Sequence, residues 1–396
     1  MNPSDIKSAQ FLDAYYPLVD GVVNTVHNYA NLMNKSAYSC VVAPKGHHSF
    51  NDKVLPYDVF RTASIKVPIA EYVIPTPKAD RGLRTFLNVK KIDIFHAHSP
   101  FTEGSFAASC AKKLSIPCVA TFHSKYYDDA LHITHSKAIA RIVANNIVRF
   151  YNSVDSVWSC SEGTAETLRS YGYKGDIFVM DNGSSMSYPD NPDELRENAR
   201  KQFDLPADKN LLLFIGHQIW HKNLGLILDT FKLLCDQSDD YILVIVGDGY
   251  DADKIRKYAD SLSFPDGAVR FVGKIVDKDL IQGLYLSAGL FFFPSVYDNS
   301  PLVVREAASL GVPSLLTEGS NAAEAVKKDF SGFTAAENKV AMYSEIVKAF
   351  SDRQRLKEIG ENARQTIPKT WEQIVSQVQE KYAEIIEKYR FEHQLT

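Results

Sequence analysis

The chain has 396 residues, of which 45% are hydrophobic and 23% are charged, as in an ordinary globular protein. Its 44 lysines and arginines are outnumbered by 48 acidic residues, so the net charge of -4 does not favour a nucleic acid as partner. A chain of this length predicts two domains of roughly 100–200 residues each.

Targeting and membrane signals are weak in this sequence. The opening segment MNPSDIKSAQ is polar, which is not the pattern of a signal peptide. Apolar runs such as LLLFIG are far shorter than the roughly 20 residues that a membrane span needs. The 5 cysteines show no paired CxxC spacing, which is typical of small buried residues in a reducing compartment. We therefore expect a cytoplasmic protein, with any membrane contact peripheral and at the inner face of the cell membrane.

Short apolar runs alternate with helical patterns through the first half of the chain. The runs that predict buried strands are SCVVAP (39–44), IDIFHAH (92–98), PCVATFH (117–123) and SVWSCS (156–161). Between them, GSFAASCAKKL and KAIARIVANNIVRFY carry apolar residues at helical spacing. Near-continuous apolar strands separated by helices indicate a parallel sheet that is covered by helices on both faces.

The same alternation resumes after a polar boundary at residues 180–210, which are rich in Pro, Asn, Asp and Gly. The later apolar runs are LLLFIG (211–216), YILVIVG (241–247) and AVRFVG (268–273), followed by GLFFFPS and VPSLLT. The last stretch, WEQIVSQVQEKYAEIIEKYRF, predicts one long helix. We therefore predict an α/β fold with two Rossmann-like, doubly wound parallel-sheet domains, residues 1–190 and 191–371, and a final helix at 372–396.

The ends of the first strands hold the first candidate residues. In open α/β sheets, ligands bind beyond the carboxyl ends of the strands, and two facing domains form a cleft. Gly21 is either a plain turn glycine or the start of a helix whose amides receive an anion. His98 and His123 are either hydrogen-bonded structural residues or parts of a polar substrate site. The histidines lack metal-ligand spacing, so we expect no metal site.

Three motifs follow strands of the second half. FIGHQIWHKN places Lys222 before a helix, either as an exposed loop lysine or as a partner for phosphate. VIVGDGYDA matches the dinucleotide-binding fingerprint in form, but its mid-chain position and the charge of Asp248 argue against a cofactor. PSVYDNSPLVVREAASLGVP sets Asp298 and Glu306 after GLFFF, where acids either cap a helix, form an acid/base pair or meet a ligand.

Taken in order, these motifs resemble the retaining glycosyltransferases of family 4, which have the GT-B fold. That family typically shows Glu-x7-Glu after a PS strand end, and here Asp298 stands in place of the first Glu while Glu306 keeps the second. It typically shows GR followed by Lys in the second domain, and here His217 replaces the Arg while Lys222 is kept. VIVGDG, FVGK, DSVWSCSEGTAETL and TWEQI also match, so the resemblance covers nearly the whole chain.

The resemblance implies roles for these residues. Lys222, with His217, would neutralise the diphosphate of a nucleotide sugar, and Gly21 would let the N-terminal loop close on the phosphate. His123 would contact the sugar near the reacting centre, and Asp298 would approach the hydroxyls of the sugar. The implied catalytic residues are thus His123, Lys222 and Asp298, with no metal and no tightly bound cofactor.

The resemblance also implies how the donor and acceptor are divided between the domains. Glu306 would bind the ribose hydroxyls of the donor. The other donor-binding residues that it implies are Gly273, Lys274, Asn299, Ser300, Pro301 and Leu302. The first domain would bind the acceptor, the second would bind the nucleotide sugar, and the last helix would cross back onto the first domain.

The expected function is transfer of a sugar from a nucleotide sugar, with a UDP-sugar as the expected donor, to a lipid or glycan acceptor. The first half looks most like bacterial enzymes that glycosylate diacylglycerol-type lipids or surface glycans. A basic stretch could rest on anionic lipid or be a solvated helix face; its cations are Lys78, Arg81, Arg84, Lys90 and Lys91. Two other functions remain open, a nonhydrolysing sugar-nucleotide epimerase and a non-catalytic sugar-nucleotide binding protein. The sequence leaves open the base, the sugar and the acceptor.

Overall fold

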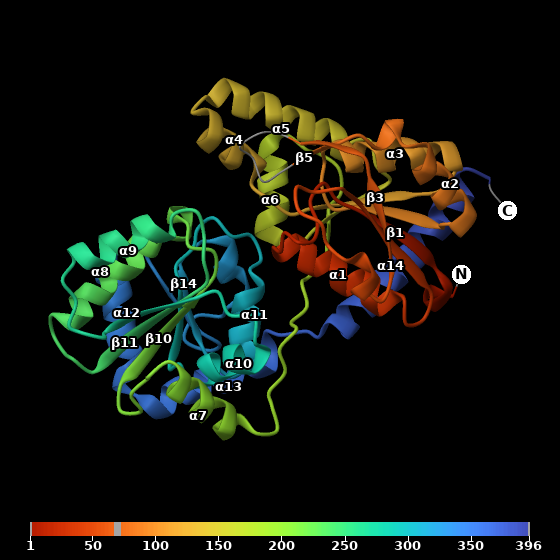
Figure 1. The fold of residues 1–396 in the computed structure, drawn as a ribbon. Coiled ribbons are helices and arrows are strands. Elements are labelled where there is room, and N and C mark those ends of the chain that lie inside the picture. Colours follow the sequence, from red (N-terminus) through yellow and green to blue (C-terminus); the bar gives the residue numbers. More distant parts are fainter. Residues whose placement is uncertain (1, 67–72, 395–396) are drawn as a thin grey trace. The chain divides into compact units, whose positions relative to one another are not determined.

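The computed structural model describes residues 2–66 and 73–394 and contains two compact units (Figure 1). The first unit is Met1–Gly183 with Thr370–Thr396, and the second is Ser184–Lys369. Each unit has its own parallel sheet, which confirms the predicted α/β fold with two doubly wound domains. The assignment of the acceptor to one unit and the donor to the other stays a prediction.

The first sheet is parallel throughout, with the strand order β3 (Asp58–Thr62), β2 (Tyr38–Pro44), β1 (Lys7–Phe11), β6 (Ile94–Ala97), β7 (Cys118–Phe122), β8 (Ser156–Ser159) and β9 (Phe178–Val179). The chain winds one way from β1 to β3 and the other way from β6 to β9, so the switch point of the sheet lies between β1 and β6. A separate antiparallel pair is formed by β4 (Ser64–Lys66) and β5 (Val73–Pro75).

The described helices of the first unit are α1 (Gly21–Met33), α2 (Arg81–Lys90), α3 (Thr102–Leu114), α4 (Tyr126–Thr134), α5 (Lys137–Tyr151), α6 (Glu162–Tyr171) and α14 (Trp371–Glu392). Short 3-10 turns are η1 (Pro3–Asp5), η2 (Asp52–Val54) and η3 (Pro77–Ala79). Side chains alternate along β1, because Ala9 and Phe11 enter the apolar core while Ser8 and Gln10 face α1 and α14. Along β1, the face that α1 and α14 cover is therefore buried but polar.

The second sheet is also parallel, with the strand order β12 (Val269–Gly273), β11 (Tyr241–Val246), β10 (Asn210–Ile215), β13 (Leu290–Phe293), β14 (Ser314–Thr317) and β15 (Phe333–Ala335). Its switch point lies between β10 and β13. The described helices are α7 (Pro192–Gln202), α8 (Leu224–Cys235), α9 (Ala252–Ser261), α10 (Lys278–Ser287), α11 (Leu302–Ser309), α12 (Lys339–Ser351) and α13 (Arg353–Thr366), with the 3-10 turns η4 (Trp220–Lys222) and η5 (Asn321–Ala325).

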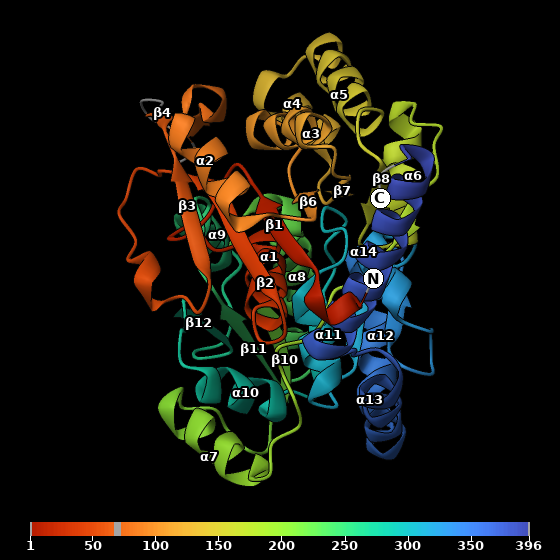
Figure 2. The ribbon, with the colours of Figure 1, turned by 90° about the vertical axis from the view of Figure 1, so that its right-hand side faces the viewer.

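The core of the second unit is made by its near-continuous apolar strands. Phe291, Phe292 and Phe293 of β13 are each 0% exposed, because helices cover both faces of the strand. Burying such a side chain contributes about 1.5–3 kcal/mol to folding. At one side of the unit α7 packs beside α10 (Figure 2). The loops that follow these strands are therefore anchored at the end of a buried, well-packed sheet.

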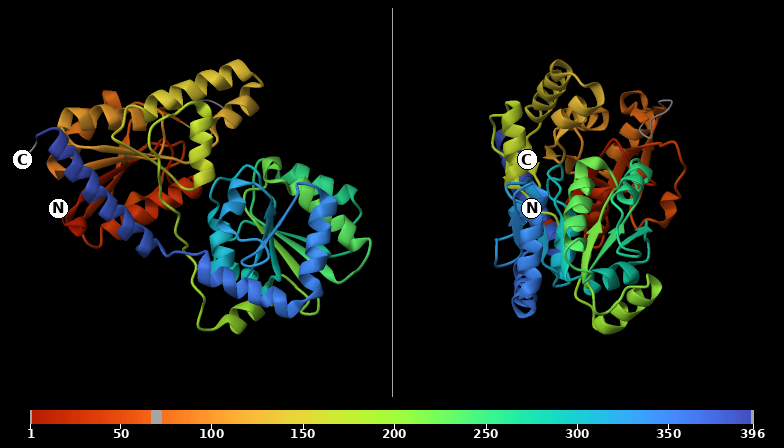
Figure 3. Two further views of the ribbon diagram at one scale, coloured as in Figure 1. Left: turned by 180° about the vertical axis from the view of Figure 1, so that it is seen from behind. Right: turned by 90° about the vertical axis from the view of Figure 1, so that its left-hand side faces the viewer.

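The C-terminal helix α14 returns to the first unit and packs against α1 (Figure 3), which confirms the predicted crossing back. Thr370 caps its first turn, and Gln373 completes a capping box. Its buried side chains recur at helical spacing and include Trp371, Val378 and Tyr382. Within the described residues, no helix combines the length and the apolar character that a bilayer span requires.

Candidate active site

Two loops flank the switch point of the second sheet, and each carries one of the predicted catalytic residues. The loop after β10 contains η4, which ends at Lys222. The loop after β13 contains Asp298 and leads into α11. Because β10 and β13 are neighbours in the sheet, their carboxyl ends bring these loops side by side.

Lys222 and Asp298 form an ion pair at this point. Lys222 Nζ donates to Asp298 Oδ1 at 2.7 Å and to Oδ2 at 3.0 Å. Both side chains are largely buried, with 13% and 18% exposed. Ser295 Oγ also donates to Asp298 Oδ2 at 2.6 Å, and Lys222 Nζ lies 5.3 Å from the ring centroid of Phe293. Charge-assisted bonds and burial therefore fix both charged groups at the end of β13.

The loop after β10 is held by close backbone contacts, which explain the glycines of VIVGDG. Gln218 N donates to Asp248 O at 2.9 Å, and Gln218 Nε2 donates to Gly247 O at 2.7 Å. Gly247 has a φ of +120°, and a Cβ on it would lie 2.0 Å from Gly216 O. A Cβ on Gly249 would lie 2.5 Å from Gln218 O. These glycines allow two loop backbones to meet, so the match to the dinucleotide fingerprint has a structural cause.

The other predicted residues near β10 and β12 lie at separate positions along the carboxyl edge of the second sheet. His217 follows Gly216 and is exposed. Gly273 ends β12 with a φ of +72°, and a Cβ there would meet nothing within 4 Å. Lys274, the next residue, is exposed. The structure thus places these residues at strand ends, while their proposed contacts with the donor stay predictions.

The segment after Asp298 leads into the first turn of α11. Asn299 is 8% exposed, and its Oδ1 accepts from Asn321 Nδ2 at 2.9 Å. Ser300 is partly buried, and α11 begins at Leu302 with Pro301 in the N-cap position and no side-chain cap. The alternative in which Asp298 caps this helix is therefore wrong. The first turn of a helix presents amide groups that lack intrahelical acceptors, and this edge is therefore favourable for an anion.

Glu306 lies on α11 and is partly buried. Tyr285 of α10 donates from its hydroxyl to Glu306 Oε2 at 3.2 Å. Burial raises the pKa of Glu306, whereas the Tyr285 bond and the charge of Lys278 act in the opposite direction. The carboxyl is thus oriented by one bond and remains able to accept others.

In the first unit, His98 and His123 follow the neighbouring strands β6 and β7, as the sequence predicts. His98 Nδ1 lies 3.2 Å from His123 Nε2. Burial lowers the pKa of His98 well below its ordinary value and that of His123 to about 4, so both rings are neutral near physiological pH. In the described ranges, no group of three or more His, Cys, Asp or Glu side chains is arranged to hold a metal ion.

Gly21 is the first residue of α1. A Cβ on Gly21 would meet nothing within 4 Å, so the packing of this unit does not itself require a glycine. Asp20 caps the helix, because its Oδ1 accepts from Val23 N at 2.8 Å. This carboxylate lies where an anionic ligand would approach the helix, and its charge opposes the predicted role of Gly21 beside a phosphate.

Sequence reasoning missed three residues that orient the candidate site: Ser295, Tyr285 and Gln10. Ser295 lies two residues after the apolar strand LFFF, and a place near a strand end indicated other candidates and could have indicated this one. Gln10 lies between Ala9 and Phe11 in the strand KSAQF, and a fully buried amide indicates a polar partner. Tyr285 lies in LYLSAG, which contains no comparable signal.

Known family models match both halves of the chain. The Glycosyltransferase Family 4 model matches residues 19–187, and the Glycosyl transferases group 1 model matches residues 196–366. The boundary between the two matches falls in the same polar segment that separates the two units.

Curated relatives align over most of the chain. An alpha-monoglucosyldiacylglycerol synthase from Streptococcus pneumoniae is 26% identical over 316 residues, which are 76% of this chain and 69% of that protein. A GDP-mannose-dependent alpha-mannosyltransferase from Corynebacterium glutamicum is 25% identical over 385 residues, which are 94% of this chain and 88% of that protein.

Solved structures share the fold. HepE from Anabaena in complex with UDP-glucose has a TM-score of 0.75 at 16% identity, covering 97% of this chain and 100% of that chain. A sucrose-phosphate synthase from Thermosynechococcus elongatus has a TM-score of 0.77 at 17% identity, with the same coverage of 97% and 100%.

The glycine contacts yield a stability prediction. Gly247→Ala should lower the free energy of unfolding by about 2–4 kcal/mol, because a methyl group would collide with Gly216 O. Gly273→Ala is the matched control: its φ is also positive but the space is open, so it should cost only about 1–2 kcal/mol. Chemical denaturation measures both. Equal losses would show that the backbone approach between the two loops is not what requires Gly247.

The burial of Glu306 yields a pH-dependent prediction. The pKa of Glu306 is higher in the folded than in the unfolded chain, because burial favours the protonated carboxyl. The contribution of this carboxyl to the free energy of unfolding is therefore full at low pH and is lost as the pH rises through the folded pKa. Glu306→Gln keeps an acceptor for Tyr285 without this titration. The melting temperature of the variant relative to wild type should therefore rise as the pH increases above about 4.5. A difference that stays constant with pH, or falls, would contradict the raised pKa.

Proposed function

The chain belongs to the glycosyltransferases of family 4 and has the GT-B fold, and on this basis we propose that it transfers a sugar from a UDP-sugar to a lipid or glycan acceptor with retention of anomeric configuration. The observation that carries this proposal is the largely buried ion pair of Lys222 and Asp298 at the switch point of the second sheet. Glu306, on the helix that follows, completes the donor site.

Lys222 stabilises the departing nucleoside diphosphate. An ammonium has three protons, so the bonds to the two Asp298 oxygens leave capacity for a phosphate oxygen. The amides at the start of α11 add partial positive charge at the same edge of the sheet. As the bond from the anomeric carbon to the diphosphate oxygen breaks, negative charge grows on that oxygen, and these groups stabilise it.

The proposed reaction needs no nucleophile from the protein. The acceptor hydroxyl oxygen bonds to the anomeric carbon on the face that the diphosphate leaves, and the hydroxyl proton passes to the departing phosphate oxygen. Asp298 and His123 hold hydroxyls of the sugar, and Glu306 accepts hydrogen bonds from the ribose hydroxyls. His217 replaces the arginine of the family with a weaker and pH-dependent cation.

The donor and acceptor classes rest on the relatives. HepE was solved with UDP-glucose, which supports a UDP-sugar, whereas the relative from Corynebacterium uses GDP-mannose. The relative from Streptococcus is a synthase of a glucosyl diacylglycerol, which supports a lipid acceptor. We therefore propose a hexose transfer in cell-envelope glycolipid or glycan synthesis, at the cytoplasmic face of the membrane and without a metal.

The surface of the first unit supports contact with anionic lipid. In the basic stretch at α2, Arg81 and Arg84 are exposed. Lys90 instead forms an ion pair, with its Nζ 2.6 Å from Asp58 Oδ2. A second surface is the hairpin of α4 and α5, which lie side by side (Figure 1). Its exposed isoleucines are Ile133, Ile139 and Ile142, with exposed fractions of 76%, 45% and 59%. The sequence of α5 has basic residues but no acid, which suits a negatively charged surface.

A donor and acceptor screen tests the proposed function. UDP-, GDP- and ADP-sugars are assayed for binding, and products with diacylglycerol and glycan acceptors are identified by mass spectrometry, with and without a chelator. We expect a glycosylated lipid or glycan from a UDP-sugar, at a rate that the chelator does not change. An epimerised sugar nucleotide formed without acceptor would indicate the epimerase, and binding without turnover would indicate the non-catalytic protein.

The same assay separates the roles of the two acids. Glu306→Ala should weaken nucleotide binding by roughly 10–100-fold, because it removes a carboxylate acceptor from the ribose. Asp298→Glu restores the residue typical of the family and should retain substantial transfer. Glu318→Ala, an exposed acid of the same unit, is the control. Intact nucleotide affinity in Glu306→Ala would refute the ribose contact.

Vesicle co-sedimentation tests the membrane proposal. The protein should bind vesicles that contain phosphatidylglycerol more strongly than neutral vesicles, and salt should weaken the binding. Ile139→Ser with Ile142→Ser should reduce it severalfold, by removing the apolar contact of α5. Ile65→Ser with Ile74→Ser removes two other exposed isoleucines of the same unit, 60% and 50% exposed, and should have little effect. If the two double variants lose vesicle binding equally, the α4–α5 surface does not bind the membrane. The same conclusion follows if anionic vesicles do not alter the rate of transfer to a soluble sugar.

A further inference from the structure

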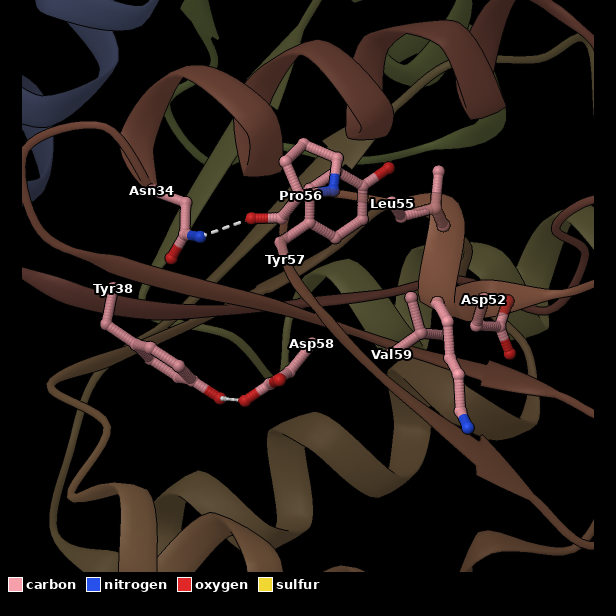
Figure 4. Close-up of a pocket in the computed structure, with 9 residues that line it drawn as sticks. Asn34, Tyr38, Asp52, Leu55, Pro56, Tyr57, Asp58 and Val59 are labelled. Atoms are coloured by element: carbon pink, nitrogen blue, oxygen red, sulfur yellow. Dashed lines mark hydrogen bonds between the residues drawn. The ribbon is translucent and has the colours of Figure 1, made fainter.

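A network of polar side chains is buried in the first unit, on the face of the sheet that α1 and α14 cover. Its fully buried members are each 0% or 1% exposed: Ser8, Gln10, His96, His98 and Tyr382. Burying a polar group without a partner costs about 1–3 kcal/mol, so such a network is stable only when its bonds are satisfied. The network is distinct from the open, polar groove between α1, η2 and β3 (Figure 4), which lies beside the starts of β2 and β3 and includes Asn34, Tyr38 and Asp58.

Gln10 of β1 joins the parts of the network. Its Oε1 lies 2.9 Å from His98 Nε2. Its Nε2 lies 3.1 Å from Ser8 Oγ and 3.5 Å from the hydroxyl of Tyr382. The same hydroxyl lies 2.6 Å from His96 Nδ1. One amide therefore connects α14 with the strand ends at β6 and β7.

The direction of these bonds follows from the two protons of the Gln10 amide. Ser8 Oγ donates to Ser39 Oγ at 2.9 Å, so it accepts from Gln10, and the Tyr382 oxygen accepts the second proton. In the reverse orientation the amide nitrogen would face only His98 Nε2, and one of its protons would lack a partner among the described contacts. The carbonyl of Gln10 thus accepts from His98.

The tautomers of the two histidines follow in turn. His98 carries its proton on Nε2, so its Nδ1 has a lone pair and accepts from His123 Nε2. His123, neutral like His98, then carries its own lone pair on Nδ1. The burial that lowers the pKa of both rings keeps them neutral, so the pattern persists at physiological pH.

We propose that Gln10, His98 and Tyr382 are positioning residues that fix the tautomer of His123, so that its Nδ1 accepts a hydrogen bond from a hydroxyl of the sugar. This inference rests on the proposed function, in which His123 meets the donor sugar. A fixed tautomer presents an acceptor without the cost of reorganising the ring, as an outer partner does for a ligand histidine. The hydroxyl of Tyr382 also gives α14 a role in the site, because the helix supplies one acceptor that orients Gln10.

Nuclear magnetic resonance of protein with 15N-labelled histidine tests the tautomer directly, with His123→Gln assigning the signal. At about pH 7, His123 should carry its proton on Nε2. Gln10→Met removes the acceptor of His98, and Tyr382→Phe, the milder change, removes the acceptor of the second amide proton. Both should convert His123 to a mixture of tautomers. A proton on Nδ1 of His123 in wild type, or an unchanged tautomer in both variants, would overturn the inference.

Kinetics separate positioning from general support of the core. Tyr382→Phe should lower kcat/KM for transfer by about tenfold. It should leave the Kd for UDP unchanged, because UDP lacks the transferred sugar that His123 contacts. Tyr151→Phe is the matched control: it removes the hydroxyl of another fully buried tyrosine, which donates to Thr121 O at 3.1 Å. Equal losses of kcat/KM in the two variants would attribute the effect to core damage and overturn the inference.

The sugar contact of His123 and the positioning role of Gln10, His98 and Tyr382 can be refuted separately. If His123→Gln retains full transfer, the proposed sugar contact of His123 is wrong and the positioning role falls with it, even where the labelled protein shows the expected tautomer. If His123→Gln loses transfer while neither Gln10→Met nor Tyr382→Phe changes the tautomer, the sugar contact stands and the positioning role is wrong.

Discussion

The reversal of strand order in each sheet is the constraint on which the candidate residues of each unit depend. Where the winding direction changes, the loops after two neighbouring strands turn to opposite faces and leave their side chains at a common edge. In the second unit, this constraint joins Lys222 after β10 to Asp298 after β13. In the first unit, Asp13 after β1 accepts from Thr102 Oγ1 at 2.7 Å and from Glu103 N at 3.0 Å, at the start of the helix after β6.

The two units apply the same topology to different electrostatics. The edge of the second sheet holds a charged pair, the amides of a helix N-terminus and an acid whose pKa burial raises. The edge of the first sheet holds neutral histidines in a satisfied hydrogen-bond network. This division suits the proposed reaction, because a leaving diphosphate needs positive charge, whereas a neutral histidine nitrogen held in place can accept a hydrogen bond from a sugar hydroxyl.

The replacement of the first family glutamate by Asp298 becomes understandable from its contacts. The shorter side chain accepts hydrogen bonds from Lys222 and Ser295, which hold it near the end of β13. The relatives reported above share about a quarter of their residues with this chain, so such local changes can be accommodated while the fold stays the same. Solved structures at 16% and 17% identity still share the fold over nearly the whole chain, so the fold does not depend on most individual side chains.

The sequence by itself determined the alternation of strands and helices, the polar boundary, the long final helix and the position of candidate residues at strand ends. These features follow from local patterns, because apolar periodicity and turn residues act over short stretches of chain. Only the tertiary structure decided which of those side chains meet. Lys222 and Asp298 are 76 residues apart, and Gln10 and Tyr382 are 372 residues apart. Contacts over such separations depend on strand order and on the return of α14, which are set by packing across the whole unit rather than by any local pattern.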